Sequence, residues 1–268
     1  MKRSLLLGAV SAMAMIASAQ AADLGGTKET VFTPPPYNWA GFYVGVNGGY
    51  AWNEGGVSVS PLEAYNCDGG WCGWENRAQK SLEGGFGGGQ IGFNLQRDRL
   101  IYGLETDIQG AGINDTATAV PDSYGFGSAH SNAQLDWFGT FRGRLGLIPY
   151  QNWLVYATAG VAYGGIQTNL SQNFNPYSVY NHNLSGSSSR DDVYAGYVLG
   201  AGVEYGFGPA WSVKFEYQFM DLGVTRLHET ASWCNCTYIS SDLESKLSFN
   251  TVRLGINYHL VPQYVPLK

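Results

Sequence analysis

The residues Trp211-Ser212-Val213-Lys214-Phe215-Glu216-Tyr217-Gln218-Phe219 alternate strictly between apolar and polar side chains. A period of two places successive side chains on opposite faces of an extended strand, whereas a helix repeats every 3.6 residues. One face would carry the aromatic and aliphatic residues, and the other would carry the serine, lysine, glutamate and glutamine. The stretch therefore predicts a β-strand with one apolar and one polar face.

The same alternation recurs along the chain and predicts eight strands. The other seven segments are 39–52, 82–95, 100–113, 132–147, 153–167, 191–207 and Thr251–Leu260. The connections alternate between tight turns, at 96–99, 148–152 and 208–210, and long polar loops rich in Gly, Asn and Ser, at 53–81, 114–131, 168–190 and 228–245. This asymmetry is typical of outer-membrane barrels. We therefore expect an all-β fold, an eight-stranded antiparallel transmembrane β-barrel with short periplasmic turns and four long extracellular loops.

The composition agrees with this fold class and excludes others. Charged residues make up 13% of the 268 residues and aromatic residues 14%, with 37 glycines. A disordered chain would be rich in charge and poor in aromatics. The mean hydropathy of −0.15 and the lack of a run of about 20 apolar residues argue against a helical membrane protein. The net charge of −6 argues against nucleic acid as a partner.

The N-terminus predicts export. Lys2 and Arg3 precede an apolar region, Leu5–Ile16, and Ala19-Gln20-Ala21 has the small-residue pattern of a cleavage site. Cleavage there would remove two positive charges, which takes the net charge from −6 to −8. We expect a signal peptide at residues 1–21 and a Pro-rich periplasmic linker at 22–38. The barrel would follow at 39–260 and a periplasmic tail at 261–268.

A soluble β-sandwich would also show alternation, but its apolar face would then be a very large exposed patch in water. We therefore expect the apolar face to contact lipid, with Trp39, Trp153 and Trp211 in the aromatic girdle at strand ends. The lipid face would hold Phe42, Val44, Val46, Tyr102, Leu104, Trp137, Phe141, Leu145, Val155, Val161, Tyr197, Leu199, Val203, Phe215, Tyr217, Val252, Leu254 and Ile256.

The inward face carries four acids and four bases, which form a predicted interior charge network. They are Glu105, Asp107, Glu204 and Glu216, with Arg142, Arg144, Lys214 and Arg253. An eight-stranded barrel has an interior just wide enough for side chains, so these charges should form ion pairs. Inward glycines would leave room for the long side chains, at Gly45, Gly92, Gly103, Gly160, Gly200 and Gly202. A plugged, structural interior is favoured over a conduction path gated by switching pairs.

Turn positions predict three registers. A hairpin centred on Pro209 places Glu204 opposite Lys214, and we expect these two residues to form an ion pair. A turn centred on Tyr150 places Arg142 opposite Thr158 and Arg144 opposite Tyr156. The turn at 96–99 places Gln90 opposite Glu105. In each hairpin the polar residues stay on one side, as a closed barrel requires.

Several segments resemble the small OmpA-like porin-family proteins of α-proteobacteria, which include surface antigens and haem-binding proteins. They are Trp39-Ala40-Gly41-Phe42-Tyr43-Val44-Gly45, Gly89-Gln90-Ile91-Gly92-Phe93-Asn94, Trp137-Phe138-Gly139-Thr140-Phe141-Arg142-Gly143-Arg144-Leu145-Gly146, Trp153-Leu154-Val155-Tyr156-Ala157 and Asn250-Thr251-Val252-Arg253-Leu254-Gly255-Ile256-Asn257-Tyr258. The resemblance implies an outer-membrane barrel with a structural and surface role in the cell envelope. It is also compatible with limited passive diffusion of small solutes. A pore-forming porin and a binder acting through the loops remain alternatives.

The resemblance implies no catalytic residues, and the expected partners are outer-membrane lipid and lipopolysaccharide, together with the barrel-assembly machinery. Family members usually end on an aromatic residue that guides assembly. Here Tyr258-His259-Leu260 is followed by a tail, so we expect the assembly signal to be internal or weaker. No peptidoglycan-binding domain is recognisable after the barrel. The oligomeric state and any loop ligand stay open.

Four cysteines lie in two of the long loops, at Cys67, Cys72, Cys234 and Cys236. Export permits disulfides, and a bond across the single residue between the last two would be strained. The last strand of a closed barrel pairs with the first, which places these loops side by side. Two bridges between the loops are therefore favoured, in either order. A zinc site is the less favoured alternative in an oxidising compartment.

Three histidines occupy different outer loops, at His130, His182 and His228, and histidine can ligate haem iron. Solvated loop histidines are the more favoured interpretation. Ser128 and Asp122 lie near His130, but no nucleophile elbow is present, so we expect no enzyme activity. The glycines of Gly87-x-Gly89-x-x-Gly92 sit within a strand and not at a strand-to-helix turn. No metal and no cofactor are expected.

Overall fold

The computed structural model describes residues 37–53, 57–59, 63–65, 71–73, 78–80, 82–119, 127–174, 184–233 and 237–260. The chain divides into two units, Met1–Pro35 and Pro36–Lys268, and all the described residues belong to the second. The expected signal peptide and C-terminal tail lie outside the described residues, as does all but the end of the expected linker. No helix among the described residues is long and apolar enough to cross a membrane.

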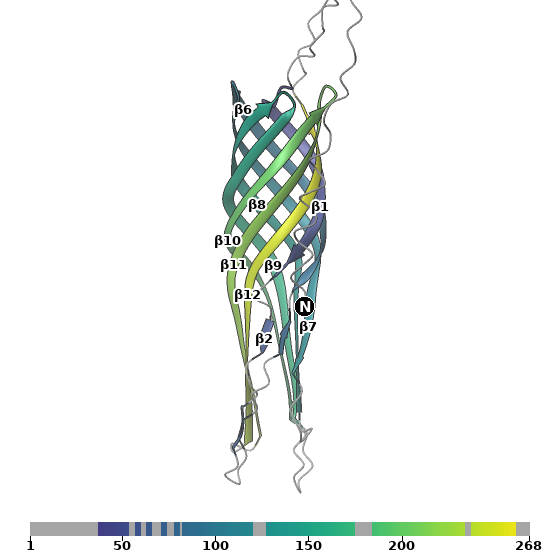
Figure 1. The fold of residues 1–268 in the computed structure, drawn as a ribbon. Coiled ribbons are helices and arrows are strands. Elements are labelled where there is room, and N and C mark those ends of the chain that lie inside the picture. Colours follow the sequence, from purple (N-terminus) through teal and green to yellow (C-terminus); the bar gives the residue numbers. More distant parts are fainter. Residues whose placement is uncertain are drawn as a thin grey trace, which may run out of the picture. The chain divides into compact units, whose positions relative to one another are not determined.

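Eight long antiparallel strands form a closed ring, as predicted (Figure 1). Each strand pairs with the next along the chain, and β1 pairs with β12 from Tyr43–His259 to Trp52–Asn250, which closes the barrel. The long strands are β1 Gly41–Trp52, β6 Glu83–Arg97, β7 Leu100–Ala119, β8 Gly127–Tyr150, β9 Trp153–Phe174, β10 Leu184–Phe207, β11 Trp211–Trp233 and β12 Thr237–His259.

Three of the four predicted long loops are mostly strand, so those loop boundaries were wrong. The β8–β9 ladder runs out to Gly127–Phe174, and the β11–β12 ladder to Trp233–Thr237. Polar residues on both strand faces indicate solvent on both sides, but backbone pairing continues without an apolar face. The first predicted loop contains four short strands, β2 Val57–Val59, β3 Glu63–Tyr65, β4 Trp71–Gly73 and β5 Ala78–Lys80.

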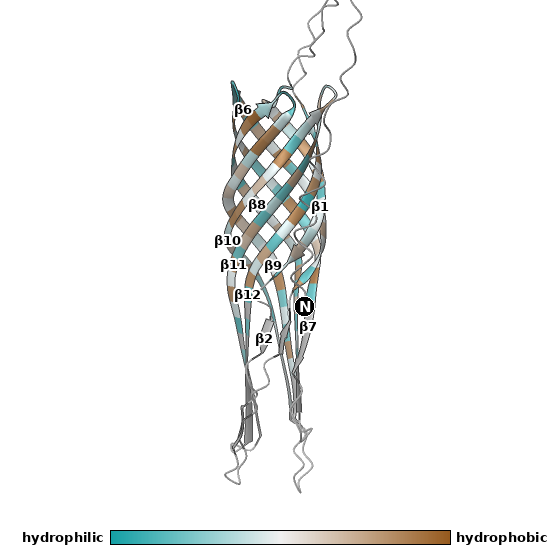
Figure 2. Cartoon of the chain, in the orientation of Figure 1, coloured by the Kyte–Doolittle hydropathy of each residue, from teal (hydrophilic) through white to brown (hydrophobic). Residues whose placement is uncertain are grey.

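Hydrophilic and hydrophobic residues mix along the strands of the barrel wall (Figure 2), and side-chain exposure shows that its two faces have the predicted polarity. Of the predicted lipid-facing residues, sixteen are exposed large hydrophobics, and Trp137 and Val252 are partly buried. Trp153 and Trp211 are exposed near the turns, as girdle residues should be. Trp39 contradicts the prediction, because it is fully buried inside the barrel mouth. It precedes β1, where no strand alternation fixes its direction, and its backbone N–H donates to Gln96 Oε1 at 2.9 Å.

One predicted register is confirmed and two are wrong by two residues. Glu204 lies opposite Lys214, but Arg142 lies opposite Gly160 and Arg144 opposite Thr158. An irregularity between Leu147 and Tyr150 shifts the β8–β9 turn.

In the β6–β7 hairpin, Gln90 lies opposite Asp107, and Glu105 lies opposite Gly92. The two-residue turn there is Asp98-Arg99, with Asp98 in the left-handed region at φ 55°. A shift of two residues preserves which face each side chain occupies, so the inward set is unchanged.

Candidate functional site: the barrel interior

All eight predicted interior charges are buried within the barrel, and none is more than 4% exposed. Arg142 is the centre of the network, because its guanidinium contacts Glu105 and Glu216, and lies 2.9 Å from Asp107. Lys214 Nζ lies 2.9 Å from Glu105 and 3.7 Å from Glu216. We call this set the charge layer, and it consists of Glu105, Asp107, Glu216, Arg142, Lys214 and Arg253.

Arg253 completes the charge layer from the last strand. Its Nη1 lies 3.0 Å from Asp107 Oδ2, and its Nη2 lies 3.8 Å from Glu216 Oε1. The layer therefore contains three acids and three bases, and its formal charge is zero. A buried charge without a partner is very costly, so this balance is what allows the six groups to remain inside.

Hydroxyl groups from neighbouring strands complete the hydrogen bonds of the acids. Tyr43 donates to Glu105 at 2.6 Å, and Tyr156 donates to Glu216 at 2.8 Å. Thr140 donates to Asp107 at 2.8 Å. Ion pairs repay the cost of burial only when the remaining lone pairs are also satisfied, so these donors support the layer.

Arg144 and Glu204 form a second ion pair, nearer the short turns. The Arg144 guanidinium lies 3.7 Å from the ring centroid of Tyr156. Glu204 also accepts hydrogen bonds from Ser212 at 2.5 Å and from Asn257 at 2.7 Å. The ring of Tyr156 therefore positions Arg144, and the hydrogen bonds from Ser212 and Asn257 position Glu204.

The predicted ion pair between Glu204 and Lys214 is wrong, although the two residues are register partners. Gly255 lies opposite Lys214 on the other side, in β12. A Cβ at Gly255 would be 3.3 Å from Lys214 Cε, so the lysine chain lies over this glycine and away from Glu204. The ammonium group then reaches Glu105 across the lumen.

Sequence reasoning missed a chain of amide side chains across the closing strands. Asn47 donates to Gln90 at 2.8 Å, Gln90 donates to Asn257, and Asn257 donates to Glu204. The chain joins β1, β6, β12 and β10. Strand alternation places Asn47, Gln90 and Asn257 on the inward face, and this was the sequence signal that could have predicted the chain.

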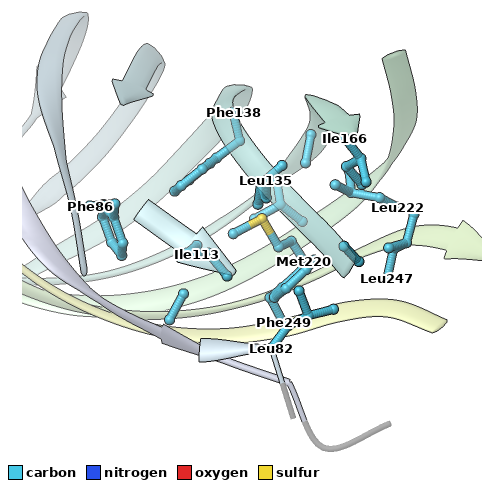
Figure 3. Close-up of a cluster of buried hydrophobic side chains, with 14 of the residues drawn as sticks. Leu82, Phe86, Ile113, Leu135, Phe138, Ile166, Met220, Leu222, Leu247 and Phe249 are labelled. Atoms are coloured by element: carbon cyan, nitrogen blue, oxygen red, sulfur yellow. The ribbon is translucent and has the colours of Figure 1, made fainter. Parts of the chain in front are cut away.

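Two apolar clusters, also missed, lie on either side of the charge layer along the strands. On β8, Phe138 belongs to the first cluster, Arg142 to the charge layer and Ile148 to the second cluster. We call the first cluster the apolar plug (Figure 3); it consists of Ala51, Leu82, Phe86, Ile113, Ala133, Leu135, Phe138, Ala162, Ile166, Leu170, Val198, Met220, Leu222, Leu247 and Phe249. We call the second the mouth cluster; it consists of Tyr37, Trp39, Ile101, Ile148, Leu154 and Tyr156.

A serine and a histidine meet in the interior without the geometry of a catalytic triad. Ser212 Oγ lies 3.2 Å from His259 Nε2, but Glu204 bonds the serine and not His259 Nδ1. A triad needs the acid on Nδ1, where it orients the imidazole. All three side chains are buried, so no substrate has direct access to them. Among the described residues, no group of acids, histidines and cysteines could hold a metal ion.

The loop residues singled out in the sequence are described only in part. His130 is in β8 and His228 is in β11, with β9 and β10 between them in the ring, and His182 lies outside the described residues. Ser128 is also in β8, and Asp122 lies outside. The two described histidines are therefore on strands that are not neighbours in the ring.

The cysteine pairing is untested, since Cys67, Cys234 and Cys236 lie outside the described residues. Cys72 is in β4, opposite Ala64 of β3. Strand β3 also pairs with β12, with Tyr65 opposite Tyr238. The strands that flank the two cysteine-bearing segments are therefore neighbours.

Comparison with known proteins places this barrel among outer-membrane proteins. Residues 7–259 match the family model described as the outer membrane protein beta-barrel domain. The chain is similar to the 31 kDa outer-membrane immunogenic protein of Brucella melitensis, with 33% identity over 96% of this chain and 99% of that protein. It is also similar to a 22 kDa outer membrane protein of Rhizobium leguminosarum, with 27% identity over 70% of this chain and 66% of that one.

Among solved structures, the chain is similar to the outer membrane protein OprG of Pseudomonas aeruginosa. The sequence identity is 14%, the TM-score is 0.46, and the match covers 84% of this chain and all of the other. The match to Neisserial surface protein A has 12% identity and a TM-score of 0.34, and covers 82% of this chain and 98% of that one.

Proposed function

Because the chain belongs to the outer membrane β-barrel domain family, and is a protein of the Gram-negative outer membrane with a structural and surface role, we propose that its barrel is closed to solutes. The interior charge network acts as a plug and not as a conduction path. The function is then exercised by the barrel wall in the envelope and by the hairpins outside it.

One observation carries this proposal, namely the succession of three filled layers in the lumen. The apolar plug, the charge layer and the mouth cluster occupy successive positions on the same strands. An eight-stranded barrel has room for little beyond its own side chains. A conducting path would have to displace residues in all three layers.

Single-channel recording in a planar bilayer tests the proposal. The oxidised wild-type protein should be silent, because the buried side chains of the three layers occupy the lumen. Arg142→Ala and Lys214→Ala each remove a cation from the charge layer and leave acids without their partners, so these variants should leak.

The matched control is Phe141→Ala, which changes the neighbouring residue on the lipid face and should stay silent. Steady conductance in the wild type, altered by Arg142→Ala or Lys214→Ala, would overturn the plug and support a pore-forming porin.

The extended hairpins support the surface part of the role. The strands continue as paired ladders beyond the level of the exposed lipid-facing residues, so they would present fixed β-structure outside the membrane; Figure 1 shows how far these strands extend. The Brucella relative is named as an outer-membrane immunogenic protein, and we expect the hairpins of this chain to be exposed at the cell surface. Antibodies raised against the hairpins should bind intact cells, and failure to bind would contradict this exposure.

A surface binder of haem is the second candidate, favoured by the position of His130 and His228 on projecting strands. Haem titration of the wild type and of variants with His130, His182 and His228 changed to alanine tests it. Binding that survives all three changes excludes these histidines as ligands.

We expect no enzyme activity and no cofactor, and we expect contacts with lipopolysaccharide and the barrel-assembly machinery.

A further inference from the structure

Two arginines differ from all others that the structure describes. Arg142, Arg144 and Arg253 pair with interior acids, and Arg190 and Arg226 pair with Asp192 and Glu244 on the projecting hairpins. Within the described part of the chain, Arg97 and Arg99 form no ion pair, and both are exposed. Their charge is therefore available to a partner outside the barrel.

Both arginines belong to the tight turn between β6 and β7. Arg97 is the last residue of β6 and lies opposite Leu100, and Arg99 follows Asp98 in the turn. The positive φ of Asp98 and the hydrogen bond from Gln96 Nε2 to Asp98 O at 3.2 Å help to define the turn. The two other short turns, at 148–152 and 208–210, contain no charged residue.

Aromatic pairs mark the membrane boundary at this end of the barrel. Trp153 packs on Tyr205 with ring centroids 4.9 Å apart, and Trp211 packs on Tyr258 at 5.0 Å. These four rings are exposed and stand at the strand ends next to the short turns, as interfacial aromatics do. A residue in a short turn therefore lies at the level of the inner-leaflet headgroups.

The turn also adjoins exposed apolar side chains. Leu95 is 59% exposed, Leu147 is 56% exposed, and Leu100 is exposed next to Arg97. Leu100 lies opposite Leu147 in the β7–β8 pair, and Leu95 lies opposite the exposed Tyr102 in the β6–β7 pair, so apolar side chains line the wall next to the turn. A lipid held by its headgroup at the arginines could lay an acyl chain along these side chains.

We propose that Arg97 and Arg99 bind the phosphate of an anionic phospholipid in the inner leaflet of the outer membrane. Guanidinium groups bind phosphate oxygens in bidentate fashion, and their long stems let the charge reach the interface. Asp98 lowers the formal charge of the turn to +1. Lipopolysaccharide occupies the opposite leaflet and is not the partner of this turn.

Native mass spectrometry of the full chain in detergent tests this site. The probes are phosphatidylglycerol and phosphatidylcholine with identical acyl chains. The wild type should retain phosphatidylglycerol preferentially. Arg97→Gln/Arg99→Gln should lower that preference about tenfold, which corresponds to the loss of a charge-assisted contact.

The matched control is Arg190→Gln/Arg226→Gln, which removes two exposed arginines from the projecting hairpins. It should keep the preference of the wild type, and heat-dependent gel migration should show that both double variants are folded. The single variants Arg97→Gln and Arg99→Gln provide the same test should the double variant fail to fold. An unchanged preference after loss of Arg97 and Arg99 would overturn the site, as would an equal loss in the control. Displacement of the lipid by inorganic phosphate would show a soluble-anion site instead.

Discussion

Arg142 of β8 contacts Glu216 of β11 across the lumen, although β9 and β10 lie between these strands in the ring. Two glycines leave space in the lumen for this contact. Gly160 lies opposite Arg142 in β9, and Gly202 lies opposite Glu216 in β10. A Cβ at Gly160 would come within 2.1 Å of a backbone oxygen. We therefore expect the ion pair to depend on the absence of a side chain at these two positions, Gly160 and Gly202.

Arg142→Ala should strongly destabilise the barrel. The change leaves Glu105, Asp107 and Glu216 buried with only two cations among them. Removing one partner of a buried pair costs about 3–5 kcal/mol. The free energy of unfolding in urea, measured in lipid vesicles, should fall by about this amount.

Phe141→Ala is the control for this measurement, since Phe141 is adjacent in sequence and half exposed to lipid. It should lower the free energy of unfolding much less. Equal losses in the two variants would mean that the charge layer contributes no more than the barrel wall.

The barrel could be predicted because its residues obey one simple period. Alternation is a local property of the chain, and it assigned Arg142, Lys214 and the other charges to the inward face whatever the register. Even the two wrong registers were wrong by two residues, so parity was conserved. Strand number and polarity therefore followed from the sequence.

What could not be predicted depends on contacts between distant strands. Lys214 passes over Gly255 to reach Glu105, and no local rule indicates the direction in which a long side chain leans. Trp39 turns inward because the other residues of the mouth cluster bury its indole there. The apolar plug was missed because its members come from all eight long strands, and they meet only when the ring closes.

Trp39→Ala should cost more stability than Trp211→Ala. Trp39 is fully buried in the mouth cluster, where its ring centroid lies 4.6 Å from that of Tyr37. Truncation of a buried tryptophan costs about 3–5 kcal/mol. Trp211 is exposed at the membrane interface, and lipid can fill the space that it leaves. Thermal unfolding of the two variants compares them directly, and a larger loss in Trp211→Ala would show that the girdle matters more than the mouth cluster.

Tyr37→Phe should leave the barrel as stable as the wild type, or more stable, near neutral pH. The Tyr37 hydroxyl is buried and has no hydrogen-bond partner among the described residues, so its removal loses no bond. Burial, with the Glu204 carboxylate, raises the pKa of the Tyr37 phenol above its usual value near 10. The neutral form is thus favoured in the folded state.

This pKa shift gives a pH dependence of known sign. Above pH about 10 the phenol ionises in the unfolded chain before it ionises in the barrel, which favours unfolding. The wild type should therefore lose stability relative to Tyr37→Phe as the pH rises past this value. Parallel stability curves for the two proteins would contradict the burial of the hydroxyl.

The cysteines should form bridges between the first and the fourth loop segments. The pairing of β3 with β12 supports this prediction, since Tyr65 and Tyr238 are register partners and each stands near a cysteine in sequence. Peptide mapping of the unreduced protein should find Cys67 and Cys72 linked to Cys234 and Cys236, in either order. A bridge between Cys67 and Cys72 would exclude the inter-loop arrangement.

Two glycines three residues apart on β6 should respond oppositely to the same substitution. A Cβ at Gly92 would lie 2.3 Å from the ring of Tyr43, which leans over this glycine to bond Glu105. Gly92→Ala should therefore displace the ring and break the hydrogen bond, at a cost of about 1–3 kcal/mol. A Cβ at Gly89, on the outer face, would meet nothing closer than a backbone oxygen at 3.7 Å.

Gly89→Ala should be neutral or stabilising, because alanine loses less conformational freedom on folding than glycine. The free energy of unfolding of both variants, measured in the same vesicles, decides the matter. Because backbone propensity is nearly the same at both positions, the difference between the variants isolates the close approach of Tyr43. Equal effects would mean that Tyr43 can move aside freely, and that its bond to Glu105 does not hold the charge layer in place.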